Sequence, residues 1–240
     1  MQVLLRLYFD RIYNPIYDLT TATLNRYRLL QARCLAALEL PAARRLLCVG
    51  LGTGSEAAAA LSIAPRLEIS GIDFSASALE ASRRKLERLG KVADLRLMDA
   101  AELAYAEGYF DRALCVHVLD FVPDVEAVIH GILRVLAPGG CFVLTLPSQL
   151  EGAALGAGLA ADEFQEILRT GRTALRALAE IVSRLFLGLL YLPLMLRSAR
   201  RFFTRDQIQE MFSRLPVCRL TIEEEKTYQD FIVSGEKGKT

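Results

Sequence analysis

Residues 46–56 read Leu-Leu-Cys-Val-Gly-Leu-Gly-Thr-Gly-Ser-Glu, an apolar run that ends in three alternating glycines. The residues from Arg45 to Val49 have the composition of a strand buried on both faces, and alanines at 57–60 favour a helix after the loop. Glycine is needed where the backbone turns sharply, adopts positive φ or approaches a ligand closely. We therefore predict a strand–loop–helix unit whose loop binds a ligand through its three glycines, Gly50, Gly52 and Gly54.

Apolar runs and helical patterns alternate along the chain on both sides of this unit. A helix is predicted from the cap residue Ser75 to about Leu89, with Gly90 as its stop. A second helix carries apolar residues at helical spacing over 125–136 and is expected to end at Pro138-Gly139-Gly140. Further strands are predicted at 67–72, 94–98, 111–116 and 141–146, with two closing strands at 217–223 and 228–234. This alternation predicts an α/β, Rossmann-like fold with a mostly parallel sheet and helices on both faces.

Two segments lie outside this alternation, and they divide the chain into four parts. Residues 1–42 are predicted to be an N-terminal helical cap, with a helix from Thr21 to Leu40 ended by Pro41. Residues 43–147 form the binding core, 148–203 a helical lid insert after the fifth strand, and 204–240 a C-terminal helix with the closing strands. Within the insert, residues 185–196 carry no charge, but a bilayer span needs about 20 apolar residues.

Composition limits the classes of function. The 240 residues carry a net charge of +1, which argues against a dedicated nucleic-acid-binding protein. Only His117 and His130 are available as imidazole ligands, so we expect no metal site. Five cysteines without a CxxC pair are typical of a reducing compartment. The N-terminus does not resemble a signal peptide, and a cytoplasmic location is expected.

Two aspartates at strand ends indicate a nucleoside ligand. Asp73 closes the second strand about twenty residues after the glycines, where a carboxylate can accept both hydroxyls of a ribose. Asp99, after the third strand, is placed to accept an adenine amino hydrogen. These features fit a nicotinamide cofactor and S-adenosylmethionine equally. A dinucleotide loop, however, prefers its third glycine at position 55, where Ser55 stands.

Taken together, residues 44–147 resemble the class I S-adenosylmethionine-dependent methyltransferases. The resemblance is carried by 46–54, Gly71–Ser75, Asp99-Ala100, Tyr109–Asp111, Val122–Asp124, the Leu-Arg-Val-Leu-Ala-Pro-Gly-Gly run at 133–140, Phe142–Thr145 and Phe202–Thr204. It implies a seven-stranded sheet whose last strand is antiparallel, with S-adenosylmethionine across the carboxyl ends of the strands.

The resemblance also implies a set of cofactor-binding residues. These are Tyr17 over the cofactor, Gly50, Leu51 and Gly52 at its methionine part, Asp73 at the ribose, Phe74, Asp99 and Ala100 at the adenine, and Val116 with His117 at the sulfonium. Many relatives carry an acid where Cys48 stands, and that acid helps to anchor the methionine amino group. Glu56 lies too far into the following helix to be expected as its replacement.

Methyl transfer from a sulfonium needs chiefly alignment and exclusion of water. A base is required only when the nucleophile arrives protonated. His117, at the end of the fourth strand, is the candidate base because a histidine pKa suits neutral pH; the alternative is a wall residue or a hydrogen-bonded spacer. Asp120 is the second catalytic candidate, as a residue that orients the donor, or else a helix-start acid.

The insert favours a lipophilic or amphipathic acceptor, such as a quinone precursor, a phospholipid head group or a polyketide-like molecule. The overall pattern is similar to the branch of quinone-biosynthesis and bacterial phospholipid methyltransferases, although Asp120-Phe121 stands where the quinone enzymes carry Arg-Asn. Residues 181–201 are a candidate for peripheral membrane contact, and the chain is expected to be a monomer or homodimer. The alternatives are a degenerate methyltransferase fold that acts as a binding or scaffold protein, and an NAD-dependent oxidoreductase.

Overall fold

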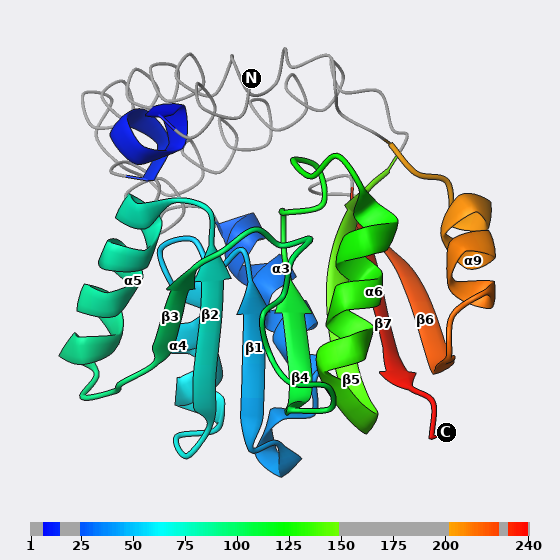
Figure 1. Ribbon diagram of the computed structural model, residues 1–240, viewed down its shortest axis with the longest axis horizontal. Coiled ribbons are helices and arrows are strands. Elements are labelled where there is room, and N and C mark those ends of the chain that lie inside the picture. The colour runs from blue at the N-terminus through cyan, green and yellow to red at the C-terminus, as the bar shows by residue number, and fades with distance from the viewer. Residues whose placement is uncertain (1–6, 15–24, 149–201, 226–229, 240) are drawn as a thin grey trace, which may run out of the picture.

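The computed structural model describes residues 7–14, 25–148, 202–225 and 230–239. They form one seven-stranded sheet in the order β3-β2-β1-β4-β5-β7-β6, covered by helices on both faces (Figure 1). The first five strands are parallel, and β7 runs antiparallel to both of its neighbours, β5 and β6. The predicted architecture of the sheet is therefore confirmed. Tyr17 and nearly all of the predicted lid insert lie outside the described residues.

The elements have the following bounds. The strands are β1 Arg45–Val49, β2 Glu68–Asp73, β3 Asp94–Leu97, β4 Phe110–Cys115, β5 Leu136–Pro147, β6 Val217–Glu225 and β7 Asp230–Lys237. The helices are η1 Phe9–Tyr13, α3 Asn25–Ala36, η2 Leu40–Ala42, α4 Ser55–Ile63, α5 Ala76–Arg88, α6 Val125–Val135 and α9 Arg205–Ser213.

Three helices begin at side-chain caps that the local sequence encodes. Ser75 Oγ accepts the Ala78 backbone N–H at 3.2 Å at the start of α5, as predicted. Asp124 caps α6 in the same way, and Thr204 forms a full capping box with Gln207 before α9. Because these bonds satisfy N–H groups that have no partner within the helix, they fix where each helix starts relative to the sheet.

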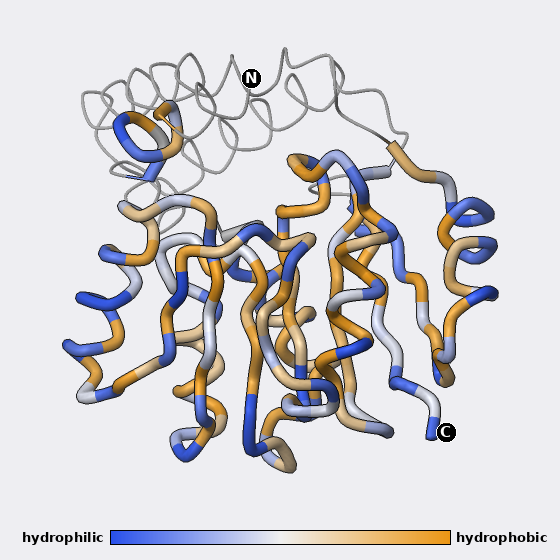
Figure 2. Tube along the Cα trace, viewed as in Figure 1, coloured by the Kyte–Doolittle hydropathy of each residue, from blue (hydrophilic) through white to orange (hydrophobic). Residues whose placement is uncertain are grey.

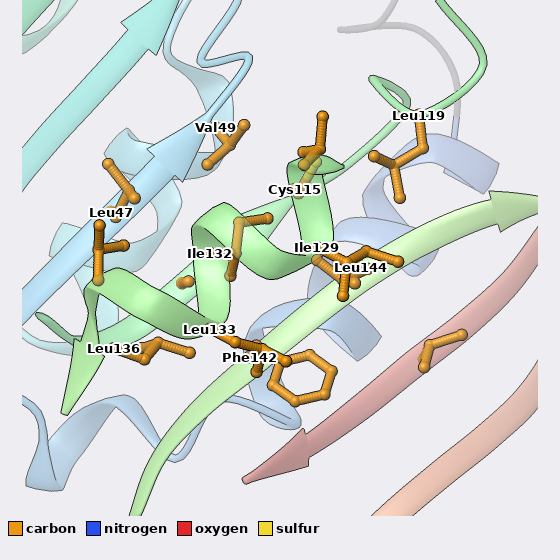
Figure 3. Packing of buried hydrophobic residues seen from close by; sticks show 14 of the residues in the cluster. Leu47, Val49, Cys115, Leu119, Ile129, Ile132, Leu133, Leu136, Phe142 and Leu144 are labelled. Atoms are coloured by element: carbon orange, nitrogen blue, oxygen red, sulfur yellow. The ribbon is translucent and has the colours of Figure 1, made fainter. Parts of the chain in front are cut away.

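The sheet separates two hydrophobic cores. Along β1, Leu47 and Val49 face the core under α6 and α9, whereas Leu46 and Cys48 face the core under α3, α4 and α5. Figure 3 shows the first core, where α6 packs on β1, β4 and β5. The inner strands are correspondingly apolar along most of their length, and polar residues gather on the outer surfaces of the helices (Figure 2). Burial on both faces explains why these strands are continuous apolar runs in the sequence.

Two predicted boundaries are wrong. The helix expected to reach Leu40 ends at Ala36, and Pro41 lies in the short η2 turn. The buried Arg112 guanidinium donates to the carbonyl oxygens of Leu38 and Glu39, and so holds this segment in its turn. In addition, α6 ends at Val135, and residues 138–140 lie within β5, where a shift in register on the β4 side accommodates them.

The two ends of the insert meet at the edge of the sheet. Ser148 pairs with Phe203 in a parallel bridge, and the Phe203 N–H donates to the Pro147 carbonyl oxygen at 2.8 Å. The chain therefore leaves β5 and returns to α9 at one place. In the part of the chain that the structure describes, no helix has the length and apolar character needed to cross a bilayer.

Candidate functional site

The glycine loop lies at the carboxyl end of β1, between β2 and β4. This position is the switch point of an open α/β sheet, where ligands bind. Gly50, Gly52 and Gly54 have φ values of 66°, 56° and 80°, which favour glycine. A Cβ at Gly50 would overlap the Val118 side chain, whereas a Cβ at Gly52 would have no described atom within 4 Å. The loop is therefore packed at Gly50 and open at Gly52.

Asp73, the predicted ribose ligand, also holds the glycine loop. Its Oδ2 accepts the Gly52 N–H at 2.8 Å, and its Oδ1 accepts the Ser75 N–H at 2.8 Å. Burial raises the pKa of Asp73 to about 6, against the lowering effect of these two backbone hydrogen bonds. The carboxylate thus ties the first loop to the start of α5, a role that the sequence did not indicate.

The N-terminal segment packs against the adenine side of the predicted site. The Phe9 ring meets the rings of Phe74 and Phe121 edge-on, with centroids 5.2 and 5.5 Å apart. Asp10 accepts hydrogen bonds from the side chains of Ser75 and Ser77 at the start of α5. In Figure 1, η1 lies beyond the carboxyl edge of the sheet, above α5. Phe74 is therefore part of an aromatic cluster, which was not predicted from the sequence.

Asp99 and Ala100 lie beside Asp73 at the same edge. The Met98 N–H donates to the Asp73 carbonyl oxygen at 3.0 Å, so the segment after β3 follows the end of β2. Asp99 is exposed, and its Oδ1 accepts the Ala101 N–H at 2.9 Å. The structure therefore brings the predicted ribose and adenine residues together.

His117 follows β4 and forms an ion pair with Asp230, in which the carboxylate is buried and the imidazole is half-buried. The imidazole Nε2 lies 2.7 Å from Asp230 Oδ2, and the His117 N–H donates to Thr145 Oγ1 at 2.8 Å. Burial lowers the pKa of His117, but Asp230, with smaller contributions from Asp120 and Glu56, raises it to about 9. Asp230 thus favours the protonated imidazole at neutral pH, and the role of His117 as a base stays a prediction.

Other residues around His117 complete this end of the site. Val116 is half-buried between β4 and His117, and Asp120 lies in the following loop, also half-buried. The Tyr27 ring of α3 lies 6.2 Å from the His117 ring, and its hydroxyl donates to Glu56 of α4. Among residues 7–14, 25–148, 202–225 and 230–239, no group of three or more His, Cys, Asp or Glu side chains could hold a metal ion.

The ion pair predicts a specific pH dependence. The folded-state pKa of His117 exceeds the unfolded value of about 6.5, so its contribution to stability is full below about pH 6.5 and is lost as the pH rises through about 9. Asp230→Asn removes the charged partner but leaves the desolvation of the half-buried imidazole, and is expected to move the pKa of His117 below about 6.5. Imidazole NMR titration measures both values, with His130→Gln to assign the signals. A wild-type His117 that titrates near 6.5 would contradict this assignment.

Comparisons with known proteins agree with this geometry. Residues 47–144 match a family described as a methyltransferase domain. A phosphatidylethanolamine N-methyltransferase of Cereibacter sphaeroides is 37% identical over 105 residues, which are 42% of this chain and 49% of the relative. A ubiquinone biosynthesis O-methyltransferase of Thiobacillus denitrificans is 37% identical over 100 residues, 41% of this chain and 42% of the relative. The chain thus spans about half the length of these curated relatives.

A solved structure extends the likeness to the whole chain. The magnesium protoporphyrin IX methyltransferase of Synechocystis PCC 6803 superposes with a TM-score of 0.65 at 13% identity, over 99% of this chain and 100% of the other. At that identity the likeness establishes the fold. Residues 47–144 therefore belong to the methyltransferase domain family, and the strand order and glycine loop agree with the resemblance of this region to the class I S-adenosylmethionine-dependent methyltransferases.

Proposed function

We propose that this protein transfers a methyl group from S-adenosylmethionine to a small lipophilic or amphipathic acceptor. The observation that carries the proposal is the glycine loop, held by Asp73 at the switch point of the sheet and open at Gly52. Two relatives named for the methylation of phosphatidylethanolamine and for ubiquinone biosynthesis support the class of acceptor.

The described residues fit S-adenosylmethionine. Gly52 has no side chain, and no described atom lies within 4 Å of where its Cβ would be. A ligand can therefore approach the backbone of the loop there. Asp73 supplies carboxylate oxygens beside the loop for ribose hydroxyls, and Asp99 supplies another at the neighbouring strand end. The loop turns into α4 at Ser55, without the further spacing that a dinucleotide loop prefers, which argues against an NAD-dependent oxidoreductase.

The role of the protein is chiefly to hold and align. When bound, S-adenosylmethionine supplies a methyl group on a sulfonium, and its transfer to the acceptor leaves S-adenosylhomocysteine. Asp73 and the loop fix the nucleoside, and the aromatic cluster of Phe9, Phe74 and Phe121 excludes water at its adenine end. We assign His117 a positioning role, because its protonated Nε2 donates to Asp230 and an imidazolium has no lone pair with which to take another proton.

An acceptor that needs no histidine base fits this arrangement. An amine that reaches the site in its neutral form, or a phenolate, attacks a methyl carbon without help from a base. Asp120 is proposed to orient the acceptor at the end of β4, where its charge lies close enough to raise the pKa of His117 alongside Asp230. The catalytic residues inferred from the sequence are therefore kept as positioning groups.

Transfer of label tests the proposed reaction. The full chain is incubated with methyl-tritiated S-adenosylmethionine and either phosphatidylethanolamine vesicles, a total lipid extract or a water-soluble metabolite extract. We expect label to enter the organic phase from a lipid acceptor, and to fail to do so with Asp73→Ala. Label confined to water-soluble products would contradict the lipophilic acceptor. Binding of the cofactor without transfer to any fraction would favour a binding or scaffold protein.

A further inference from the structure

A carboxylate with no ion-pair partner in the described part of the chain follows the glycine loop. Glu56 stands in the first turn of α4, two residues after Gly54, and is half-buried. Its Oε1 accepts hydrogen bonds from the Tyr27 hydroxyl and from the Gln31 amide nitrogen, the latter at 3.3 Å. Both donors are neutral. Among the described residues, no side chain donates to Oε2 and no Lys, Arg or His nitrogen lies within the 4.0 Å of an ion pair.

The cations nearest in the fold are engaged elsewhere. Arg33 of α3 bonds to two glutamates of β6, at 2.8 and 3.2 Å. His117 is paired with Asp230 at 2.7 Å, and Lys85 of α5 donates to the Ser55 hydroxyl at 2.9 Å. Among the described residues the charge of Glu56 therefore has no counter-ion, and a half-buried carboxylate is stabilised by a cation with good hydrogen-bond geometry.

Glu56 lies on the His117 side of the glycine loop. The Tyr27 hydroxyl donates to Glu56, and the Tyr27 ring lies 6.2 Å from the His117 ring, so one tyrosine side chain contacts both residues. The charge of Glu56 also acts on His117 at the end of β4. Asp73 ends β2, on the opposite side of β1. Because β1 lies between β2 and β4, a ligand held by Asp73 that crosses the end of β1 extends toward His117 and Glu56.

On the basis of the proposed function, we propose that Glu56 binds the ammonium group of the methionine part of S-adenosylmethionine. An ammonium has three N–H donors and no acceptor, which matches a carboxylate whose Oε2 has no donor among the described residues. Tyr27 and Gln31 hold the other oxygen, so the carboxylate is oriented before the ligand arrives. This proposal departs from the expectation, drawn from the sequence, that Glu56 lies too far into the helix to replace the acid at position 48.

The test compares two ligands that differ in the group Glu56 would bind. S-adenosylhomocysteine carries the amino-acid part, whereas 5′-methylthioadenosine has the same thioether nucleoside without it. Loss of a charge-assisted hydrogen bond changes an affinity by about ten- to hundredfold. We expect Glu56→Gln to lower the affinity for S-adenosylhomocysteine by that factor and to leave the affinity for 5′-methylthioadenosine unchanged, as measured by titration calorimetry.

Tyr27→Phe is the matched control, because it removes one hydrogen bond to Glu56 but keeps the charge of the carboxylate. It is expected to lower the affinity for S-adenosylhomocysteine by less than about threefold. Equal weakening of both ligands by Glu56→Gln would show a structural role and overturn the inference. Unchanged affinity for S-adenosylhomocysteine would also overturn it, while leaving the proposed function intact. A wild-type protein that binds neither ligand would overturn the proposed function, and this inference with it.

Discussion

Gly52→Ala is expected to abolish detectable binding of S-adenosylhomocysteine while leaving the protein folded. Gly52 has a φ of 56°, and a Cβ there would meet no described atom within 4 Å. The added methyl group therefore points into open space at the loop, which is where we place the ligand. A left-handed alanine lowers the free energy of unfolding by about 1–2 kcal/mol, whereas a methyl group placed between ligand and backbone removes contacts worth at least about a hundredfold in affinity.

Gly90→Ala is the matched control for Gly52→Ala. Gly90 follows α5 with a φ of 68°, and a Cβ there also meets no described atom within 4 Å. The two variants should thus lose similar amounts of stability in chemical denaturation, and only Gly52→Ala should lose the ligand. Undiminished binding by Gly52→Ala would show that the ligand does not pass over this loop.

Asp73→Ala has the second large effect, because one side chain serves both the ligand and the loop. Removing the carboxylate leaves the N–H groups of Gly52 and Ser75 without their acceptor and removes the acceptor for ribose hydroxyls. We expect S-adenosylhomocysteine to bind at least about a hundredfold more weakly, as measured by calorimetry. Asp99→Asn, which changes an exposed carboxylate at the neighbouring strand end, is expected to have a smaller effect. Equal affinity of Asp73→Ala and wild type would contradict this role.

The pKa of Asp73 gives the same prediction a pH dependence with a definite sign. The folded-state pKa of about 6 lies above the unfolded value of about 3.9, so the folded protein binds more protons between these values. The contribution of Asp73 to the free energy of unfolding therefore rises as the pH falls from about 6 to about 4. The affinity for S-adenosylhomocysteine should fall as the pH falls, because the protonated carboxyl accepts fewer hydrogen bonds. Calorimetry from about pH 5 to about pH 8 would show it, and a flat profile would contradict it.

The fold could be predicted where local patterns carry it. Strands buried on both faces are continuous apolar runs, and Gly50, Gly90 and the cap residue Ser75 mark boundaries that depend only on nearby residues. The boundary at Ala36 could not be predicted, because it depends on hydrogen bonds from Arg112, far along the chain. The length of β5 likewise depends on its pairing with β4.

The residues of the candidate site divide in the same way, into those whose position the local sequence marks and those whose chemistry depends on distant partners. The positions of Asp73 and Asp99 follow from strand ends, which the sequence marks. The protonation of His117 does not, because its partner Asp230 is 113 residues away and belongs to β7. Long-range partners thus decide the chemistry of residues whose location is locally encoded.

Titration of the full chain with S-adenosylmethionine at neutral pH tests the central claim most directly. The account predicts heat with one-to-one stoichiometry and micromolar affinity, and no heat with NAD⁺ at the same concentrations. Absence of heat at millimolar S-adenosylmethionine, in protein shown to be folded, would contradict it.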